Sequence, residues 1–403
     1  MSSEWKTYTV QELIDAGMLD EPLDGNHGSI HPKASDYVSA GVPFIMANDL
    51  VNGKVDYANC AYITEAQAST LRKGFAKPGD VLLTHKATIG RTAIVSDEYD
   101  TIILTPQVTY YRVKKDISNR YLKYYFDSST FQQLFANWAG SGSTRAYLGI
   151  TAQRKLPIVL PPYEVQLKIA KCCGVLDDKI YQNQRINDNL EQQAKAIFSK
   201  EFLTLETLPN GWKRASLIDI ADYLNGLAMQ KYRPTADETG IPVLKIKELR
   251  QGCCDDNSEL CSPNIKSEYI VHDGDVIFSW SGSLLVDFWC GGICGLNQHL
   301  FKVTSSNYDK WFYYSWTKHH LDRFVAVAAY KATTMGHIKR DELAKAEVLI
   351  PNEADYKRIR TLLQPIYDLI ITNRIENKRL AKIRDTLLPK LMSGELDVSA
   401  IQL

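Results

Sequence analysis

The sequence predicts an α+β protein with an internal pseudo-two-fold repeat, in which two mixed α/β globules are held apart by two long antiparallel coiled-coil helices. Three observations support this prediction. The two halves of the chain match each other at collinear positions, each half contains short β-branched and aromatic runs, and each half ends in a long heptad pattern. At 403 residues the chain is also too long for a single compact core.

The internal repeat is clearest in the helical segments, where matching residues are separated by 190 positions. Leu190 matches Leu380, for example, and Asn183 matches Asn373. Upstream segments match with small insertions: VPFIMANDLVNG (42–53) with IPVLKIKELRQG (241–252), KPGDVLLTHKATIG (77–90) with VHDGDVIFSWSGSL (271–284), and TPQVTYYRV (105–113) with NQHLFKV (297–303), which aligns Gln107 with Gln298. This period is longer than that of solenoid repeats, so it indicates duplication of a whole domain together with its helix.

Within each globule, strands and helices give different patterns. Runs such as 42–47 and 108–113 are rich in β-branched and aromatic residues and are bounded by Gly, Pro, Asp and Asn, as expected of short strands. Segments 118–138 and 308–328 have apolar and aromatic residues at helical spacing, so each is predicted to be an amphipathic helix packed on a sheet. Their aromatic side chains are interpreted as core residues rather than as platforms for stacking on bases.

Two long helices are predicted after LPPYE (160–164) and LIPNE (349–353), whose prolines end a strand and begin a helix. In both helices the seam residues alternate at spacings of four and three, which is the pattern of a coiled coil. The first seam comprises Ile169, Cys173, Leu176, Ile180, Asn183, Asn187, Leu190, Ala194 and Ile197, and the second comprises Ile359, Leu363, Ile366, Ile370, Asn373, Asn377, Leu380, Arg384 and Leu387.

Two asparagines lie in the middle of each seam, where a coiled coil normally has apolar residues. The first helix must deliver the chain to the second globule, and a second helix packed along the first runs back, so the pair is antiparallel. The midpoints of the seams then place Asn183 level with Asn373, with Asn187 and Asn377 to either side. Paired seam amides can set helix register, and a wet, loosely packed centre is the alternative.

The composition is that of an ordinary globular protein. The formal net charge is zero, with 47 basic and 47 acidic residues, which argues against simple electrostatic binding of nucleic acid but allows local basic surfaces. No apolar run is long enough for a membrane helix and no signal peptide is visible. A disulfide framework is typical of a short secreted chain, and because this chain is neither short nor visibly secreted, a reducing, cytoplasmic location is expected. Cys253, Cys254, Cys261, Cys290 and Cys294 cluster in the sequence; zinc binding is one interpretation, but no pair has CxxC spacing, which favours buried thiols.

Several segments resemble the DNA-specificity subunit of type I restriction–modification enzymes, and the resemblance covers essentially the whole chain. LPPYEVQLKIAKCCGVLDDKIYQNQRINDNLEQQAKAIF (160–198) is similar to the family's central conserved region, and RIENKRLAKIRDTLLPKLMSGEL (374–396) to its distal one. DGNHGSIHPKASDYVSAGVPFIMANDL (24–50) and KPGDVLLTHKATIGRTAIV (77–95) look like parts of its target-recognition domains. Two departures are Cys172-Cys173-Gly174, which replaces the usual aliphatic residues, and IPNEADYKRI, which replaces the LPPxxEQ form at the distal helix.

The resemblance implies target-recognition domains at 1–162 and 205–352, a central conserved spacer helix at 163–204, and a distal conserved spacer helix with the C-terminal tail at 353–403. Each domain would read one half of a bipartite, gapped target in double-stranded DNA, and the helices would set the gap. The chain would dock two adenine-methyltransferase subunits and, through them, nuclease-translocase subunits. It would itself be non-catalytic and would need no cofactor.

Motifs for catalysis within the chain are incomplete or absent. Leu160-Pro161-Pro162-Tyr163 approaches the Asp/Asn-Pro-Pro-Tyr/Phe motif of adenine methyltransferases, but it lacks the polar first residue and recurs as Leu349-Ile350-Pro351 at a second strand-to-helix junction. The sequence has no GxxxxGK[ST] phosphate loop and no HExxH pattern. A self-contained methyltransferase-endonuclease is therefore disfavoured.

Base reading requires Arg, Lys, Asn, Gln, Ser or Thr side chains on projecting loops, with phosphate contacts from Lys and Arg. Four polar loops qualify in each half: 27–33, 48–49, 85–91 and 140–147, and then 230–233, 245–247, 279–283 and 330–337. The candidate DNA-binding residues are His27, His31, Lys33, Asn48, Lys86, Thr88, Arg91, Ser143, Thr144 and Arg145 in the first half, and Lys231, Tyr232, Arg233, Lys247, Ser281, Lys331, Thr333, Thr334 and His337 in the second. The alternative for each residue is ordinary solvated surface, and for the whole chain it is a structural assembly protein whose duplicated globules bind protein.

Overall fold

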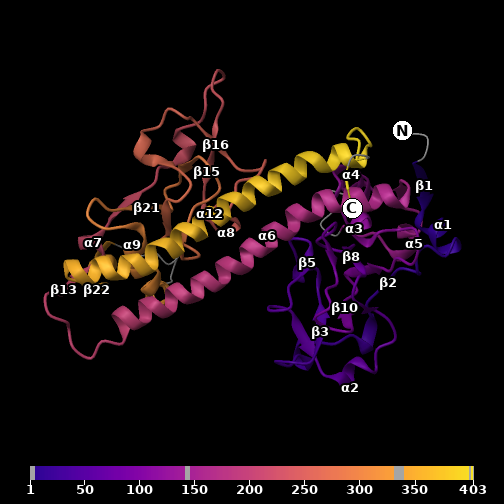
Figure 1. Cartoon of the computed structure of the whole chain (residues 1–403), viewed down its shortest axis with the longest axis horizontal. Coiled ribbons are helices and arrows are strands. Elements are labelled where there is room, and N and C mark those ends of the chain that lie inside the picture. Colours follow the sequence, from indigo (N-terminus) through magenta and orange to yellow (C-terminus); the bar gives the residue numbers. More distant parts are fainter. Residues whose placement is uncertain (1–4, 141–145, 331–339, 399–400, 403) are drawn as a thin grey trace. The chain divides into compact units, whose positions relative to one another are not determined.

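The computed structural model describes residues 5–140, 146–330, 340–398 and 401–402. The chain forms two units, unit 1 with residues 1–178 and 382–403 and unit 2 with residues 179–381 (Figure 1). Each unit contains part of both long helices. The duplication predicted from the sequence can therefore be tested by comparing the two units strand by strand.

Unit 1 contains two four-stranded sheets. One has the order β6-β3-β10-β7 and is built by Ala61–Ile63, Val42–Ile45, Ile102–Leu104 and Phe75–Ala76. The other has the order β2-β11-β8-β9 and is built by Leu23–Asp24, Val108–Tyr111, Val81–Thr84 and Thr92–Ile94. In addition, β1 (Lys6–Thr9) pairs with β12 (Pro157–Leu160), and β4 (Leu50–Val51) pairs with β5 (Lys54–Val55).

Unit 2 repeats these sheets in the same strand order. One sheet, β16-β15-β20-β17, is built by Leu260–Cys261, Ile241–Leu244, Cys294–Leu296 and Ile270–Val271. The other, β14-β21-β18-β19, is built by Asp222–Asn225, Leu300–Thr304, Val276–Ser279 and Leu285–Phe288. The pair β13 (Lys213–Ser216) and β22 (Glu347–Ile350) matches β1 and β12. Because β3–β10 and β15–β20 are also both parallel, the predicted duplication is confirmed.

The strand register corrects one predicted match between the halves. The amide of His85 donates to the carbonyl of Gln107 at 2.9 Å, and the amide of Trp280, which follows β18, donates to the carbonyl of His299 at 3.4 Å. Gln107 therefore corresponds to His299, and the predicted match with Gln298 is wrong by one position. Side-chain likeness suggested that match, whereas the backbone hydrogen bonds of the ladder determine the register.

Each segment predicted to be a single amphipathic helix is two helices. In unit 1, α3 (Asn119–Asp127) and α4 (Ser129–Trp138) meet at Ser128, whose backbone is extended and whose Oγ accepts from the amide of Phe131 at 3.3 Å. This cap ends one helix and begins the next, so the prediction of one helix over 118–138 is wrong. In unit 2, α9 (Lys310–His319) and α10 (Leu321–Tyr330) divide at His320. The shorter helices are α1 (Val10–Asp15), α2 (Glu65–Ala68), α5 (Ile150–Gln153), α7 (Leu217–Ile220), α8 (Ile246–Gln251) and α11 (Arg340–Ala344).

Aromatic side chains of the paired helices form the core of each unit, as predicted. Phe126 and Phe135 are fully buried in unit 1 with strand residues such as Val81. Trp311 occupies the corresponding layer of unit 2 with Phe278. Burial of each such side chain contributes about 2–3 kcal/mol, so these helices hold the sheets that position the loops.

The two long helices are α6 (Tyr163–Phe198) and α12 (Glu353–Met392). Although the distal segment departs from the LPPxxEQ form, α12 begins at Glu353, where Oδ1 of Asn352 accepts from the amide of Asp355 at 2.9 Å. All predicted seam positions are buried or half-buried. The seam ends belong to the unit cores: Ile169 packs in unit 1, and Ile359 packs in unit 2.

Within unit 2, α6 and α12 run antiparallel, as predicted, and their asparagines are hydrogen-bonded across the pair. Nδ2 of Asn183 donates to Oδ1 of Asn377, and Nδ2 of Asn373 donates to Oδ1 of Asn187, both at 2.9 Å. Asn183 therefore lies opposite Asn377 and is not level with Asn373. This register differs from the midpoint estimate because it forms two amide pairs. Three of the four asparagines are buried, which does not fit a wet, loosely packed centre.

Candidate nucleic-acid interface

In unit 1, the predicted loop after β8 (85–91) is a closed turn held by α4. The amide of Gly90 donates to the carbonyl of Thr84 at 2.8 Å, and Gly90 has a φ angle of 84°. This positive φ favours glycine, and a β-carbon on Gly90 would also displace the end of the Gln132 side chain, whose Oε1 would lie 2.3 Å away. The turn leaves the side chains of Lys86 and Thr88 exposed.

This turn adjoins two of the other loops predicted to read DNA. The amide of Ala87 donates to the carbonyl of Ala146 at 3.0 Å, at the end of the loop 140–147. Nη1 of Arg91 donates to the carbonyl of Asn48 at 3.5 Å, and the Asn48 side chain is exposed. Residues 48, 86–91 and 146–147, which are far apart in the sequence, therefore lie side by side. The predicted residues Ser143, Thr144 and Arg145 lie outside the described residues.

Asp24, at the end of β2, joins the fourth loop to this surface. Its carboxylate accepts from Nε2 of His27 at 2.9 Å and from Nζ of Lys73. Burial raises the pKa of Asp24, but the hydrogen bonds from Lys73 and His27 outweigh it, so the net pKa is below the usual value. Nε2 of the buried His85 lies 4.0 Å from the same carboxylate, and burial lowers the pKa of His85, which favours the neutral ring.

The side chains of the other predicted residues of unit 1 differ in their exposure to solvent. The ring of His31 packs on Phe44, with centroids 5.5 Å apart, and its Nδ1 is buried, so His31 belongs to the support of the loop. Lys33 is exposed. Lys86 lies with Nζ 6.0 Å from the ring centre of Tyr147, which is 51% exposed. An exposed cation beside an exposed aromatic ring suits contact with a phosphate and a neighbouring sugar or base.

In unit 2, the predicted loop 230–233 lies at the edge of the sheet that contains β15 and β16. Lys231 and Tyr232 are exposed, and Lys231 has no charged partner among the described residues. Nη2 of Arg233 lies 3.3 Å from Oε2 of Glu259, which also binds Lys245 at 2.6 Å. Part of the basic charge predicted here is therefore already neutralised within the unit.

Ser281 is placed differently from its prediction. It is 2% exposed, and its hydroxyl is 3.1 Å from Nδ1 of His299. Its side chain supports the loop 279–283, whereas Ser283 of the same loop is exposed. The predicted residues Lys331, Thr333, Thr334 and His337 lie outside the described residues.

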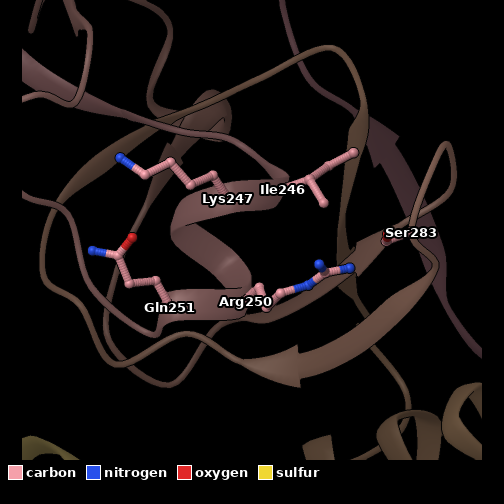
Figure 2. Close-up of a pocket in the computed structure, with 5 residues that line it drawn as sticks. All are labelled: Ile246, Lys247, Arg250, Gln251 and Ser283. Carbon is pink, nitrogen blue, oxygen red and sulfur yellow. The ribbon is translucent and has the colours of Figure 1, made fainter. Parts of the chain in front are cut away.

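The helix α8 carries the predicted residue Lys247 and one residue that the sequence reasoning missed. Figure 2 shows four side chains of α8 with Ser283 around a groove of about 480 Å³. Nζ of Lys247 lies 3.1 Å from Oδ2 of Asp255, so its charge is paired. Arg250 is exposed and has no such partner in the described part of the chain. The spacing of lysine and arginine in KELR (247–250) was the signal available for finding it.

Equivalent positions in the two units hold different chemistry. Asp24 of unit 1 pairs with Thr109 of β11, and Asn225 of unit 2 pairs with Phe301 of β21. Thr109 and Phe301 each come two residues after the matched positions Gln107 and His299, so Asp24 corresponds to Asn225. His85 corresponds to Trp280, whose Nε1 donates to Oδ1 of Asn225 at 3.0 Å. The geometry of a ring contacting a polar side chain is kept, while an ionisable pair in unit 1 is replaced by a neutral one in unit 2. The two surfaces therefore offer different hydrogen-bonding groups at equivalent positions.

Further properties narrow the possible chemistry of the described residues. They contain no group of three His, Cys, Asp or Glu side chains arranged for a metal ion, and Cys254 and Cys294 lie with their sulfurs 3.4 Å apart as free thiols. Among the described residues, no helix combines the length and the apolarity that spanning a bilayer requires.

The duplicated fold with two unlike polar surfaces is that of a protein that selects DNA sequences. The family model described as "Type I restriction modification DNA specificity domain" matches residues 2–192 and 209–384, and the chain belongs to this family. Its role is accordingly DNA sequence specificity, and the alternative of a structural assembly protein is not favoured.

Named relatives match nearly the whole chain. The chain is 27% identical to the type I restriction enzyme MjaIX specificity subunit of Methanocaldococcus jannaschii, covering 98% of this chain and 95% of the relative. It is 20% identical to the HindI specificity subunit of Haemophilus influenzae, covering 98% and 100%. The crystal structure of the S subunit from M. genitalium has the same fold, with a TM-score of 0.55, 14% identity and 96% coverage of both chains.

Proposed function

We propose that each unit reads one half of a bipartite, gapped DNA target and that α6 and α12 set the gap. The observation that carries this proposal is the repetition of one two-sheet fold with different side chains at equivalent positions of the loop surface. Duplicated DNA-binding domains place their half-sites at a distance given by protein geometry. Unlike surfaces then suit an asymmetric pair of half-sites.

In this proposal the recognition domains are 1–162 and 205–352, and the spacer segments are 163–204 and 353–403. The hydrogen bonds Asn183–Asn377 and Asn187–Asn373 support a fixed helix register, because sliding either helix by one turn would leave buried amides without partners. A fixed register gives a fixed spacing between half-sites.

The partners in this proposal are two adenine-methyltransferase subunits bound to the spacer helices and nuclease-translocase subunits bound through them. Catalysis, both adenine methylation and DNA cleavage, would reside in these partners. The zero net charge supports this division, since a chain with 47 basic and 47 acidic residues gains little from unspecific attraction to phosphates and needs partners to tighten the complex. The proteins named as relatives are themselves specificity subunits of type I restriction enzymes.

The test is to sequence the methylome of a host that expresses the partner methyltransferase with and without this chain. We expect a gapped adenine motif that appears only when the chain is present. In unit 1, Thr88→Ala and Asn48→Ala, which remove two exposed polar side chains, should change only one half of the motif. A host methylome that is the same with and without the chain would sink the proposal.

The spacer role has its own test, based on the observed register. One helical turn of about four residues is inserted after Asn187 and, opposite it, before Asn373, so that both asparagine pairs are kept. The helices gain about 6 Å, so the gap should lengthen by one or two base pairs at ~3.4 Å each, with both half-sites unchanged. Insertion in α6 alone should abolish recognition, and an unchanged gap with the double insertion would contradict the spacer role.

A further inference from the structure

The helix α8 marks a local difference between the two units. After β3, unit 1 continues with a short 3-10 turn, Ala47–Asp49, and the hairpin β4–β5. After the equivalent strand β15, unit 2 forms α8. The side chains that follow the central parallel strand therefore project from a helix in unit 2 and from a turn and hairpin in unit 1.

The side chains of α8 divide into two sets at helical spacing. Figure 2 shows Lys247 and Gln251 on one side of the helix, while Ile246 and Arg250 extend toward the loop that contains Ser283. Asp255 binds both side chains of the first set, since its Oδ2 lies 3.1 Å from Nζ of Lys247 and 3.2 Å from Nε2 of Gln251. The hydrogen bonds from Gln251 and Lys247 lower the pKa of Asp255 to about 2, so it is charged and neutralises the lysine.

Arg250 is the basic residue that α8 leaves available. It is exposed, and within the described residues no carboxylate or carbonyl accepts from its guanidinium. It lines the groove of about 480 Å³ together with Ile246 and Ser283. A guanidinium that the fold leaves unpaired at a groove is suited to an external acceptor.

Contacts of Glu248 and Leu249 hold the backbone of α8 that carries Arg250. Glu248 is 3% exposed, and its carboxylate accepts from the amide of Lys245 and from the hydroxyl of Ser258, both at 3.2 Å. Leu249, the neighbour of Arg250, is buried in the core that contains β15 and β20. The helix is therefore fixed at its start and along its inner face, so little backbone ordering remains to be lost when Arg250 binds.

We propose that Arg250 reads a guanine through the major groove in the half-site bound by unit 2. Two parallel N–H groups of a guanidinium match O6 and N7 of guanine, a pattern that no other base pair presents at that position. Ser283, across the groove, is placed to contact the adjacent phosphate. This inference rests on the proposed function, because it needs unit 2 to bind a half-site.

The test uses the full chain in complex with its methyltransferase partner and compares Arg250→Ala and Arg250→Lys. Both variants should keep the motif except at one G·C pair of one half-site, where discrimination falls about ten- to hundredfold. Lysine keeps the charge but not the fork of donors, so it should not restore the guanine. Arg214→Ala is the matched control, since Arg214 is an exposed arginine of unit 2 already paired with Glu347.

Each possible motif of the variants either supports or overturns the guanine contact of Arg250. A wild-type motif without a G·C pair in the affected half, or an unchanged motif in both variants, overturns the proposal. Uniform weakening in Arg250→Ala that Arg250→Lys restores shows a phosphate contact and also overturns it. If the wild-type chain directs no gapped methylation at all, the proposed function itself is wrong, and the guanine contact of Arg250 is wrong with it. Melting temperatures of both variants equal to that of the wild type show that the change is not due to unfolding.

Discussion

Asn373 donates from Nδ2 to Oδ1 of Asn187 at 2.9 Å across the helix pair of unit 2. Shifting each number by the repeat offset of 190 converts this contact into that between Asn183 and Asn377, which is also 2.9 Å long. One amide contact therefore occurs twice, as a consequence of the duplication. Nδ2 of Asn187 also donates to the carbonyl of Ile370 at 3.3 Å, so this asparagine uses both ends of its amide.

Replacing Asn373 by alanine should lower the free energy of unfolding by about 1–3 kcal/mol, because it leaves Oδ1 of the buried Asn187 without a donor. The double variant Asn187→Leu and Asn373→Leu should recover most of that loss, since neither amide then remains unpaired. Urea-induced unfolding measures both. Asn189→Ala, an exposed asparagine on the same helix, is the control, and an equal loss in the control would show that the amide pair contributes nothing.

Gly25→Ala should be one of the most destabilising small changes in unit 1. A β-carbon on Gly25 would lie 1.9 Å from the carbonyl oxygen of Leu104, so β10 would have to move, at about 3 kcal/mol. Gly28→Ala in the same loop meets nothing within 4 Å and should lose only about 1 kcal/mol, from its φ of 76°. Thermal unfolding compares the two, and equal shifts would contradict the close approach. Gly226 is the equivalent residue of unit 2, where an added β-carbon would lie 2.2 Å from the carbonyl oxygen of Asn297.

The carboxylate of Asp177 should make unit 1 less stable in acid. Burial raises the pKa of Asp177, but Lys123, the hydroxyl of Tyr124 and the guanidinium of Arg384 lower it more, so the net pKa is below 3.8. A depressed pKa in the folded state stabilises the protein above the unfolded pKa and ceases to do so as the pH falls through the folded value. At pH 7, Asp177→Asn should lose about 2 kcal/mol, and its difference from the wild type should shrink below about pH 4.

The neighbouring residue supplies the control for this pH dependence. Asp178 pairs with Arg120 at 3.1 Å, but both side chains are 50% exposed. Asp178→Asn should therefore change the stability by about 0.5 kcal/mol or less at either pH. Equal effects of the two substitutions, measured by urea unfolding between pH 3 and pH 7, would show that the partners of Asp177 do not stabilise its charged carboxylate.

Lys86→Ala should weaken DNA binding by the methyltransferase complex and reduce the slope of log K against log salt by about one, if Lys86 neutralises one phosphate. The weakening should be uniform across target sequences because phosphates carry no sequence information. Arg154→Ala is the control, since Arg154 is a basic residue of unit 1 already paired with Glu21. Binding isotherms at several salt concentrations measure the slope, and an unchanged slope would remove Lys86 from the interface.

Periodicity within the sequence was sufficient for the elements whose structure is local. The seams of α6 and α12 follow from spacings of four and three, and the duplication follows from collinear matches, because both patterns are visible without knowing any distant contact. The family follows from the same segments. The sequence by itself therefore determined the two-fold repeat, the helix pair and the role in DNA specificity.

Contacts between distant residues decided the rest, and they are not encoded in local spacing. Ser128 divides a helix because its hydroxyl caps the next one, and Ser281 turns inward because His299 lies beside it. Asp255 pairs with Lys247 and leaves Arg250 as the available cation of α8. The register of the asparagines is set by two hydrogen bonds that only the packed helices can form. Which side chains face outward, and with what charge, depends on such partners, so only the tertiary structure decided it.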